Sequence, residues 1–189
     1  TIENVHLSNV KLMTKTEKNN ADNFYIGGLV AHTEGTTIKN CSIAYKNFST
    51  PNICDVDGNK LSTARVGGLV GFSRETIISN CFATNVFINV NLGSSDGIGG
   101  LVGHYTGEIT NCYTTGQIRT NTQEVGGIFG RTLYTSYYQE RAWVKEDNIC
   151  NNCYSAVNIR TESSSLGGIG GFVDLKVIGE LENNISIGN

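Results

Sequence analysis

The chain has 189 residues, with 23 glycines, one proline, 39% hydrophobic residues and a formal net charge of -3. This length and apolar content allow a single folded domain with a sizeable core. The charge excludes the basic surface that holds nucleic acid, and no apolar run approaches the roughly 18 residues of a membrane span.

Two short signals recur in chain order. The first is a glycine pair between aliphatic residues, as in "VGGLVG". The second follows each pair and places an asparagine before a cysteine or an aliphatic residue, as in "EITNC". The shortest period, between Gly99 and Gly126, takes 27 residues. The paired glycines are Gly27, Gly28, Gly67, Gly68, Gly99, Gly100, Gly126, Gly127, Gly167 and Gly168.

The shortest period holds three short β-type segments, which is what one coil of a parallel β-solenoid needs. Helical repeats require apolar residues at a period of 3.6, and glycine, asparagine and β-branched residues interrupt every candidate. A β-propeller blade needs a longer period. We therefore predict an all-β parallel β-helix (β-solenoid) over 1–189, with about five coils of roughly three short strands. Loop insertions are expected near 12–24, 49–65, 91–97 and 131–148.

The aliphatic residues that flank each glycine pair are three positions apart, as Val66 and Leu69 are. A regular strand cannot point both to one face. We expect the pair to form a corner or kink that turns both inward, where glycine supplies positive φ or lets two backbones approach closely.

The Asn-Cys signals predict a structural ladder, because cysteine packs as a small buried hydrophobe. One stacked position is expected to hold Val5, Cys41, Cys81, Cys112, Cys153 and Ile185. The exposed turn before it is expected to hold a ladder of hydrogen-bonded amides from Asn4, Asn40, Asn80, Asn111, Asn152 and Asn184.

The remaining reactive residue types do not assemble a site. Cys54 and Cys150 are expected outside the predicted ladder, within insertions, and a disulfide between them stays open. The "CNNC" spacing that ends at Cys153 lacks the second half of a zinc site. The carboxylates after the glycine strands are scattered as solvated turn positions, Glu34, Glu75, Glu108 and Glu180. We assign no catalytic residue, no metal ligand and no cofactor, and we expect no enzyme activity in this segment.

The insertion at 131–148 carries the only tryptophan, with tyrosines and arginines beside it. Aromatic and arginine side chains are common at binding hot spots. The alternative is that the loop packs against the flank of the solenoid. The candidate binding residues are Arg131, Tyr134, Tyr137, Tyr138, Arg141 and Trp143.

The stretches "VGGLVGFSRETIISNCFATN" and "IGGLVGHYTGEITNCYTTGQI" resemble the GLUG repeat almost throughout. "IGGLVAHTEGTTIKNCSIA" departs from it at Ala31, while "VGGIFGR" and "LGGIGGF" are degenerate copies. The family implies a non-catalytic extracellular module of a bacterial surface or secreted protein, acting as a rigid stalk or an adhesin-like binding surface. It implies a protein or glycan ligand on a host or neighbouring cell, and flanking domains in the same chain.

Two alternatives remain open. Similar repeats precede the protease domain of zinc metalloendopeptidases of the immunoglobulin-A-specific type, so the segment is alternatively an accessory region that engages the substrate. The "HExxH" zinc motif of such enzymes is absent, since none of His6, His32 and His104 has a second histidine four residues on. A β-helix enzyme that acts on polysaccharides is a third reading. Both ends of the sequence fall inside repeats, and we expect the native chain to continue beyond them.

Overall fold

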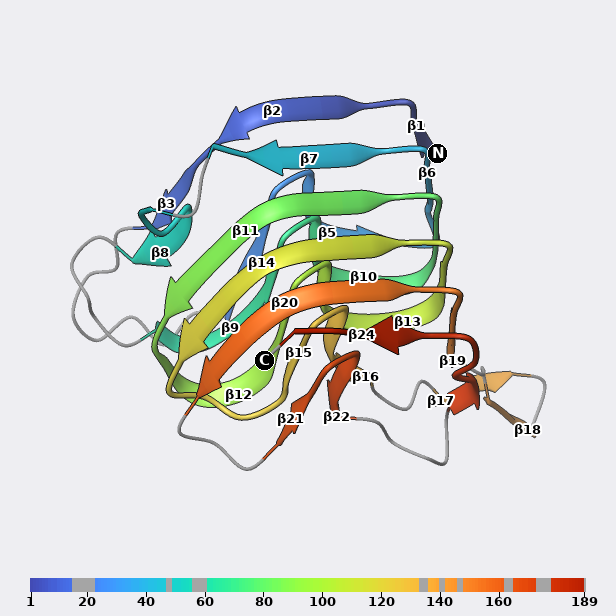
Figure 1. The fold of residues 1–189 in the computed structure, drawn as a ribbon. Helices are drawn as coiled ribbons and strands as arrows, with labels where there is room; N and C mark the ends of the chain where they lie inside the picture. Colours follow the sequence, from blue (N-terminus) through green and yellow to red (C-terminus); the bar gives the residue numbers. More distant parts are fainter. Residues whose placement is uncertain are drawn as a thin grey trace.

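The computed structural model describes residues 1–14, 23–46, 49–55, 61–132, 136–139, 142–145, 148–161, 165–172 and 178–188. These residues form strands and turns. Most of the strands lie side by side in three parallel sheets that the chain visits in turn (Figure 1). The predicted fold class is confirmed: the protein is an all-β parallel solenoid. Within the described ranges no helix is long and apolar enough to cross a membrane.

The three sheets take one strand or strand pair from each coil. Sheet A contains β1 (Ile2–Glu3), β5 (Val30–Glu34), β6 (Thr37–Lys39), β10 (Val70–Ser79), β13 (Val102–Thr110), β16 (Phe129–Thr132), β19 (Asn148–Asn151), β22 (Gly170–Phe172) and β23 (Ile178–Glu180). Sheet B contains β2 (His6–Val10), β3 (Leu12–Thr14), β7 (Ser42–Tyr45), β8 (Ile53–Asp55), β11 (Phe82–Val90), β14 (Tyr113–Thr120), β20 (Tyr154–Thr161) and β24 (Ile185–Ser186). Sheet C contains β4 (Asn23–Gly27), β9 (Leu61–Gly67), β12 (Leu92–Gly99), β15 (Val125–Gly126) and β21 (Leu166–Gly167).

A complete coil runs from sheet C through sheet A to sheet B, as β9, β10 and β11 do. The bend between sheets C and A falls at each glycine pair. None of the paired glycines has positive φ, so the reason for glycine is space. A Cβ atom on Gly67 would overlap the carbonyl oxygen of Val70 and lie 2.7 Å from the backbone of Gly103 in the next coil. The pairs are corners, as predicted, and they are corners of close backbone approach.

Hydrogen bonds between coils explain this closeness. The amides of Leu69 and Val70 both donate to the carbonyl oxygen of Leu101, at 2.8 and 3.0 Å. The amides of Leu101 and Val102 donate in the same way to Ile128 of the following coil. The aliphatic residues on both sides of the inner corners are buried in the core, whereas Leu166 of the last coil is 50% exposed.

The glycine after each corner is also enclosed by the preceding coil. A Cβ on Gly103 would lie 2.5 Å from the amide nitrogen of Val66 and the carbonyl oxygen of Gly71. Ala31 takes the equivalent place in the first corner, and its side chain is exposed. In this copy of the repeat the alanine methyl group therefore has room.

The bend from sheet A to sheet B uses the asparagines, whose φ values of 53° to 58° place them in the left-handed region. Asparagine adopts that conformation more readily than other non-glycine residues. The side chains are exposed, and one side-chain bond along the row is present, from Asn40 Nδ2 to Asn4 Oδ1 at 3.4 Å. The residues with this backbone are Asn4, Asn40, Asn80, Asn111, Asn152 and Asn183.

The predicted register of the last coil is therefore wrong by one residue. Asn183, not Asn184, adopts the turn, and Ile185 pairs with Tyr154 in sheet B. Asn184 takes the position that cysteine holds in the earlier coils. Two adjacent asparagines in "ENNI" made the two registers indistinguishable from the sequence.

Several segments predicted as insertions are partly strands of the coil. Leu12–Thr14 pairs with Ile53–Asp55, which in turn pairs with β11. The predicted 91–97 insertion lies largely in β12, which pairs with β9 along sheet C. Glycine and serine in "LGSSDGIG" favoured a loop locally, and pairing with neighbouring coils overrides that preference.

Replacing Gly67 by alanine tests the close approach. We expect Gly67→Ala to lower the free energy of unfolding by more than about 3 kcal/mol, because the added methyl group overlaps the Val70 carbonyl of its own corner and crowds the backbone of the next coil. Gly35→Ala is the matched control: Gly35 has a φ of 58° but nothing within 4 Å of the added Cβ. Its cost is about 1–2 kcal/mol. Urea titrations of both variants measure the difference, and equal losses would contradict a corner set by close approach.

Candidate binding face

The predicted cysteine ladder lies inside the solenoid, where sheet A passes into sheet B. Each ladder thiol donates to the carbonyl oxygen two residues earlier, for example Cys112 to Thr110 at 3.1 Å. The amide of Cys81 donates to the sulfur of Cys112 at 3.4 Å. The ladder residues Cys41, Cys81, Cys112 and Cys153 are at most 2% exposed.

Asn184 ends this ladder in the last coil. Its Oδ1 accepts from the amide of Cys153 at 2.8 Å, and its Nδ2 donates to the carbonyl oxygen of Cys150 at 2.7 Å. An amide side chain therefore makes the contact that a sulfur makes in the inner coils. The prediction of an aliphatic residue at this end is wrong.

Cys150 is a second surprise, because it lies in the core and not in an insertion. It pairs in register with Ile109 in sheet A and is fully buried. All six cysteines are free thiols, so no disulfide joins Cys54 and Cys150. Among the described residues, no three His, Cys, Asp or Glu side chains gather as a metal site.

The ladder thiols are buried and therefore out of reach of a reagent, and desolvation also raises the pKa of the Cys112 thiol well above its usual value. Cys54 alone is half-buried. We expect a thiol reagent at neutral pH to modify one cysteine of the folded protein quickly and the other five only on unfolding. Cys54→Ser should remove the fast phase. If several thiols of that variant still react quickly with the reagent, the result would contradict the packing of the ladder.

The predicted binding loop is only partly described. Tyr134 and Arg141 lie outside the described residues. Tyr137, Tyr138 and Trp143 belong to an antiparallel hairpin of β17 (Ser136–Gln139) and β18 (Ala142–Lys145), in which Tyr138 pairs with Trp143. Arg131 is separate from the hairpin, within sheet A. Its guanidinium is 3.2 Å from the carboxylate of Glu124 and 5.2 Å from the ring of Phe172. A binding role of this loop stays a prediction.

A stack of rings covers the outside of the glycine corners. The sequence analysis did not predict this stack. The ring of Phe72 lies 5.0 Å from the rings of both His32 and His104. The guanidinium of Arg65 lies 4.7 Å from the same ring, and its Nη1 donates to the hydroxyl of Tyr25 at 3.0 Å. The three stacked rings share one register position in successive coils, so the stack follows from the repeat.

His104 is the buried member of this stack. Its side chain is 1% exposed, and neither ring nitrogen has a hydrogen-bond partner in the described part of the chain. Burial lowers its pKa to about 3, and the charges of Arg65 and Arg131 contribute to this shift. His104 is therefore neutral in the folded protein and serves packing.

This burial predicts a pH dependence of stability. Between pH 3 and 6.5 the unfolded chain binds a proton at His104 that the folded chain does not, so stability falls as pH falls. Phenylalanine occupies the same row at Phe72, and His104→Phe should remove this contribution. Between pH 6 and 4 the wild-type free energy of unfolding should fall by up to about 1.4 kcal/mol per pH unit more than that of the variant. Identical slopes in denaturant titrations would contradict a neutral, buried His104.

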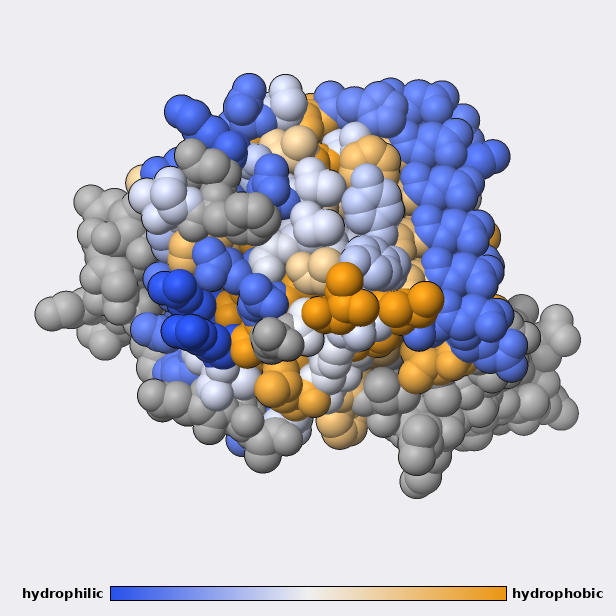
Figure 2. Space-filling model, viewed as in Figure 1, coloured by the Kyte–Doolittle hydropathy of each residue, from blue (hydrophilic) through white to orange (hydrophobic). Residues whose placement is uncertain are grey.

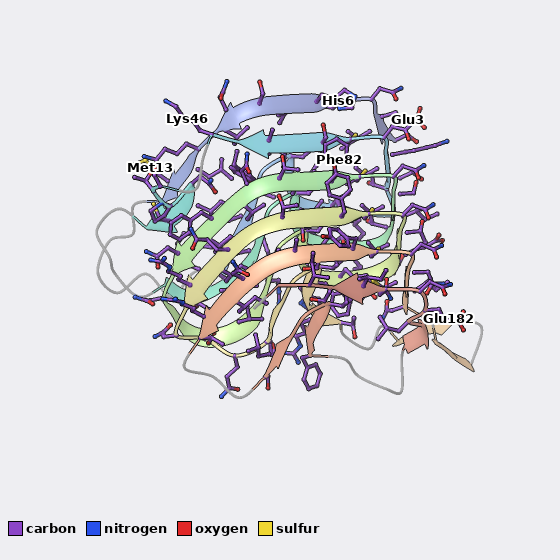
Figure 3. The ribbon with its side chains drawn as sticks, in the orientation of Figure 1. Glu3, His6, Met13, Lys46, Phe82 and Glu182 are labelled. Carbon is purple, nitrogen blue, oxygen red and sulfur yellow. The ribbon has the colours of Figure 1, made fainter. Side chains whose placement is uncertain are left out.

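The outer face of sheet B presents a second aromatic row. Phe82 and Tyr113 stack with ring centroids 4.7 Å apart and planes 7° from parallel, and Tyr154 follows in register. Phe82 and His6 lie at the same end of this sheet (Figure 3). His6 Nδ1 is 2.7 Å from Ser42 Oγ, which is the distance of a base and a nucleophile. His6 and Ser42 are register partners in sheet B, so the contact joins neighbouring positions of the row.

The other end of this face is hollowed around two arginines. A hollow of about 390 Å³ is lined by residues 117–119 and 158–160. A second hollow of about 330 Å³ adjoins it and shares Arg119 and Arg160. We call the two together the arginine hollow. Figure 2 shows this face, which has its strongest hydrophilic colour over the ends of the long strands of sheet B.

The two arginines are neighbours in the sheet. Arg119 pairs in register with Arg160, and Gln117 pairs with Asn158. Arg119 lies over the ring of Phe87, 5.1 Å from its centroid, and its Nη2 is 3.4 Å from Gln117 Oε1. Both arginines are exposed. The arrangement offers two guanidinium groups and two amides on one surface.

The coils of this solenoid match a known repeat. The model of the GLUG motif matches residues 22–43, 62–91 and 94–119, each of which contains a glycine pair and the strand that follows it. The fold is that of a repetitive parallel solenoid, and three of its coils carry the GLUG repeat. The glycine pairs at Gly126 and Gly167 lie outside the three matched ranges. No curated protein and no solved structure matches the chain.

Proposed function

We propose that this protein is a non-catalytic interaction module that presents the outer face of sheet B to a ligand outside the cell. The observation that carries the proposal is the arginine hollow, since two hollows adjoin one another on this face and share the same two cations. Hollows with a few convergent polar groups are the usual form of binding sites.

The rigidity of the solenoid supports a presenting role. Each coil bonds through its backbone to the coils on either side, and a continuous core runs through all of them. Solenoids of this kind build extended binding surfaces from in-register side chains. The face therefore keeps its shape without a ligand, which lowers the entropic cost of binding.

The family match supports a role without catalysis. GLUG is a repeat motif, and its residues in this chain serve corners and turns. The resemblance to repeats of bacterial surface and secreted proteins supports a location at the cell exterior, with a protein or glycan on a host or neighbouring cell as partner. The free thiols do not oppose this location, because the buried ladder is shielded from oxidants.

Binding of the labelled, intact chain to an array of extracellular glycans and matrix proteins tests the proposal. We expect at least one ligand to bind without being consumed. Tyr113→Ala should weaken that binding by about tenfold, because Tyr113 is 36% exposed on the presented face. Ile77→Ala is the control, since Ile77 is 45% exposed on sheet A. No bound ligand, or chemical turnover of one, would overturn the proposal.

A further inference from the structure

No carboxylate in the described part of the chain compensates the charge of the arginine hollow. Arg74 lies 3.3 Å from Glu34, and Arg131 lies 3.2 Å from Glu124. Within the described ranges, no carboxylate lies within 4.0 Å of Arg119 or Arg160. The chain has 17 acidic residues, yet none of those described is placed beside this pair.

Two like charges side by side in a sheet are unfavourable. Strands in a sheet are about 4.8 Å apart, and directly neighbouring like charges destabilise the pair. Gln117 and Asn158 stand in the row beside the arginines without neutralising them. An anion bound between the guanidinium groups would remove this repulsion.

The side chains of the hollow are also preorganised for such an anion. The Phe87 ring and the Gln117 amide hold the guanidinium of Arg119 in place. A guanidinium fork matches the two oxygens of a carboxylate. The amides of Gln117 and Asn158 both donate and accept, which suits the hydroxyl groups of a sugar.

Other classes of ligand fit less well. Two cations are too few to hold a nucleic-acid backbone. A peptide that adds as a strand needs free backbone groups, and β14 is already paired on both sides, with β11 and β20. Recognition in the hollow must come from side chains, and the ones present favour an acidic sugar.

We propose that the arginine hollow binds a carboxylate-bearing oligosaccharide, with one uronate carboxylate between Arg119 and Arg160 and the sugar hydroxyls on Gln117 and Asn158. This inference rests on the proposed function and names the ligand class of the same face. Binding is electrostatic in part, so added salt weakens it.

Titration calorimetry of the intact chain with a trimer of galacturonic acid tests the inference. The methyl ester of the same trimer is the matched probe, because it keeps the sugar and removes the charge. We expect the acid to bind and the ester to bind about tenfold or more weakly. Equal binding of acid and ester, or preference for a sulfated oligosaccharide without carboxylates, would overturn the assignment.

Two variants locate the site. Arg160→Gln should weaken binding of the acid trimer by about tenfold, and Arg160→Lys should restore part of it by keeping the charge without the fork. Arg74→Gln is the control, since it removes the same charge from a paired arginine on sheet A. Unchanged binding by Arg160→Gln would overturn the inference. If the acid trimer does not bind, but another ligand still binds in a manner that depends on Tyr113, then the assignment of an acidic oligosaccharide is wrong. The proposed function would still hold in that case.

Discussion

At the first four glycine pairs, the backbone of one coil passes so close to the next that a Cβ atom has no room. This contact fixes the distance and the register between coils, because two successive amides after the glycine pair donate to a single carbonyl of the next coil. The bend turns the two flanking aliphatic residues into the core. The other rows of stacked residues, in the core and on the surface, are aligned by this corner.

Because the coils are aligned in register, rows of chemically different residues form on the same solenoid. The same register that buries a column of cysteines places the rings of Phe72 and His104 against each other outside the corner. On sheet B it places Arg119 beside Arg160. Inward positions must keep their size and polarity, whereas outward positions are free to vary. A binding surface on such a scaffold therefore arises by substitution of outward residues in adjacent coils, without a change in the core.

The sequence predicted the solenoid, its corners and the buried cysteine ladder because each depends on short spacings that repeat. The errors fall where spacing is ambiguous or repeats are irregular. Adjacent asparagines concealed the place of Asn184, and a long insertion hid Cys150 from the Ile109 row that it joins. The arginine hollow was missed for a different reason. Arg119 and Arg160 are 41 residues apart, and only the register of β14 and β20 makes them neighbours.

Native-state hydrogen exchange at the corners tests most directly whether close approach holds the coils together. We predict that the amides of Leu69, Leu101 and Ile128, which bond between coils at 2.8 to 3.0 Å, exchange only when the whole protein unfolds. They should then share the protection of the central strands of sheets A and B. Rapid exchange of these three amides, with the sheets still protected, would show that the corners are ordinary loops and would contradict a solenoid held together at its glycine pairs.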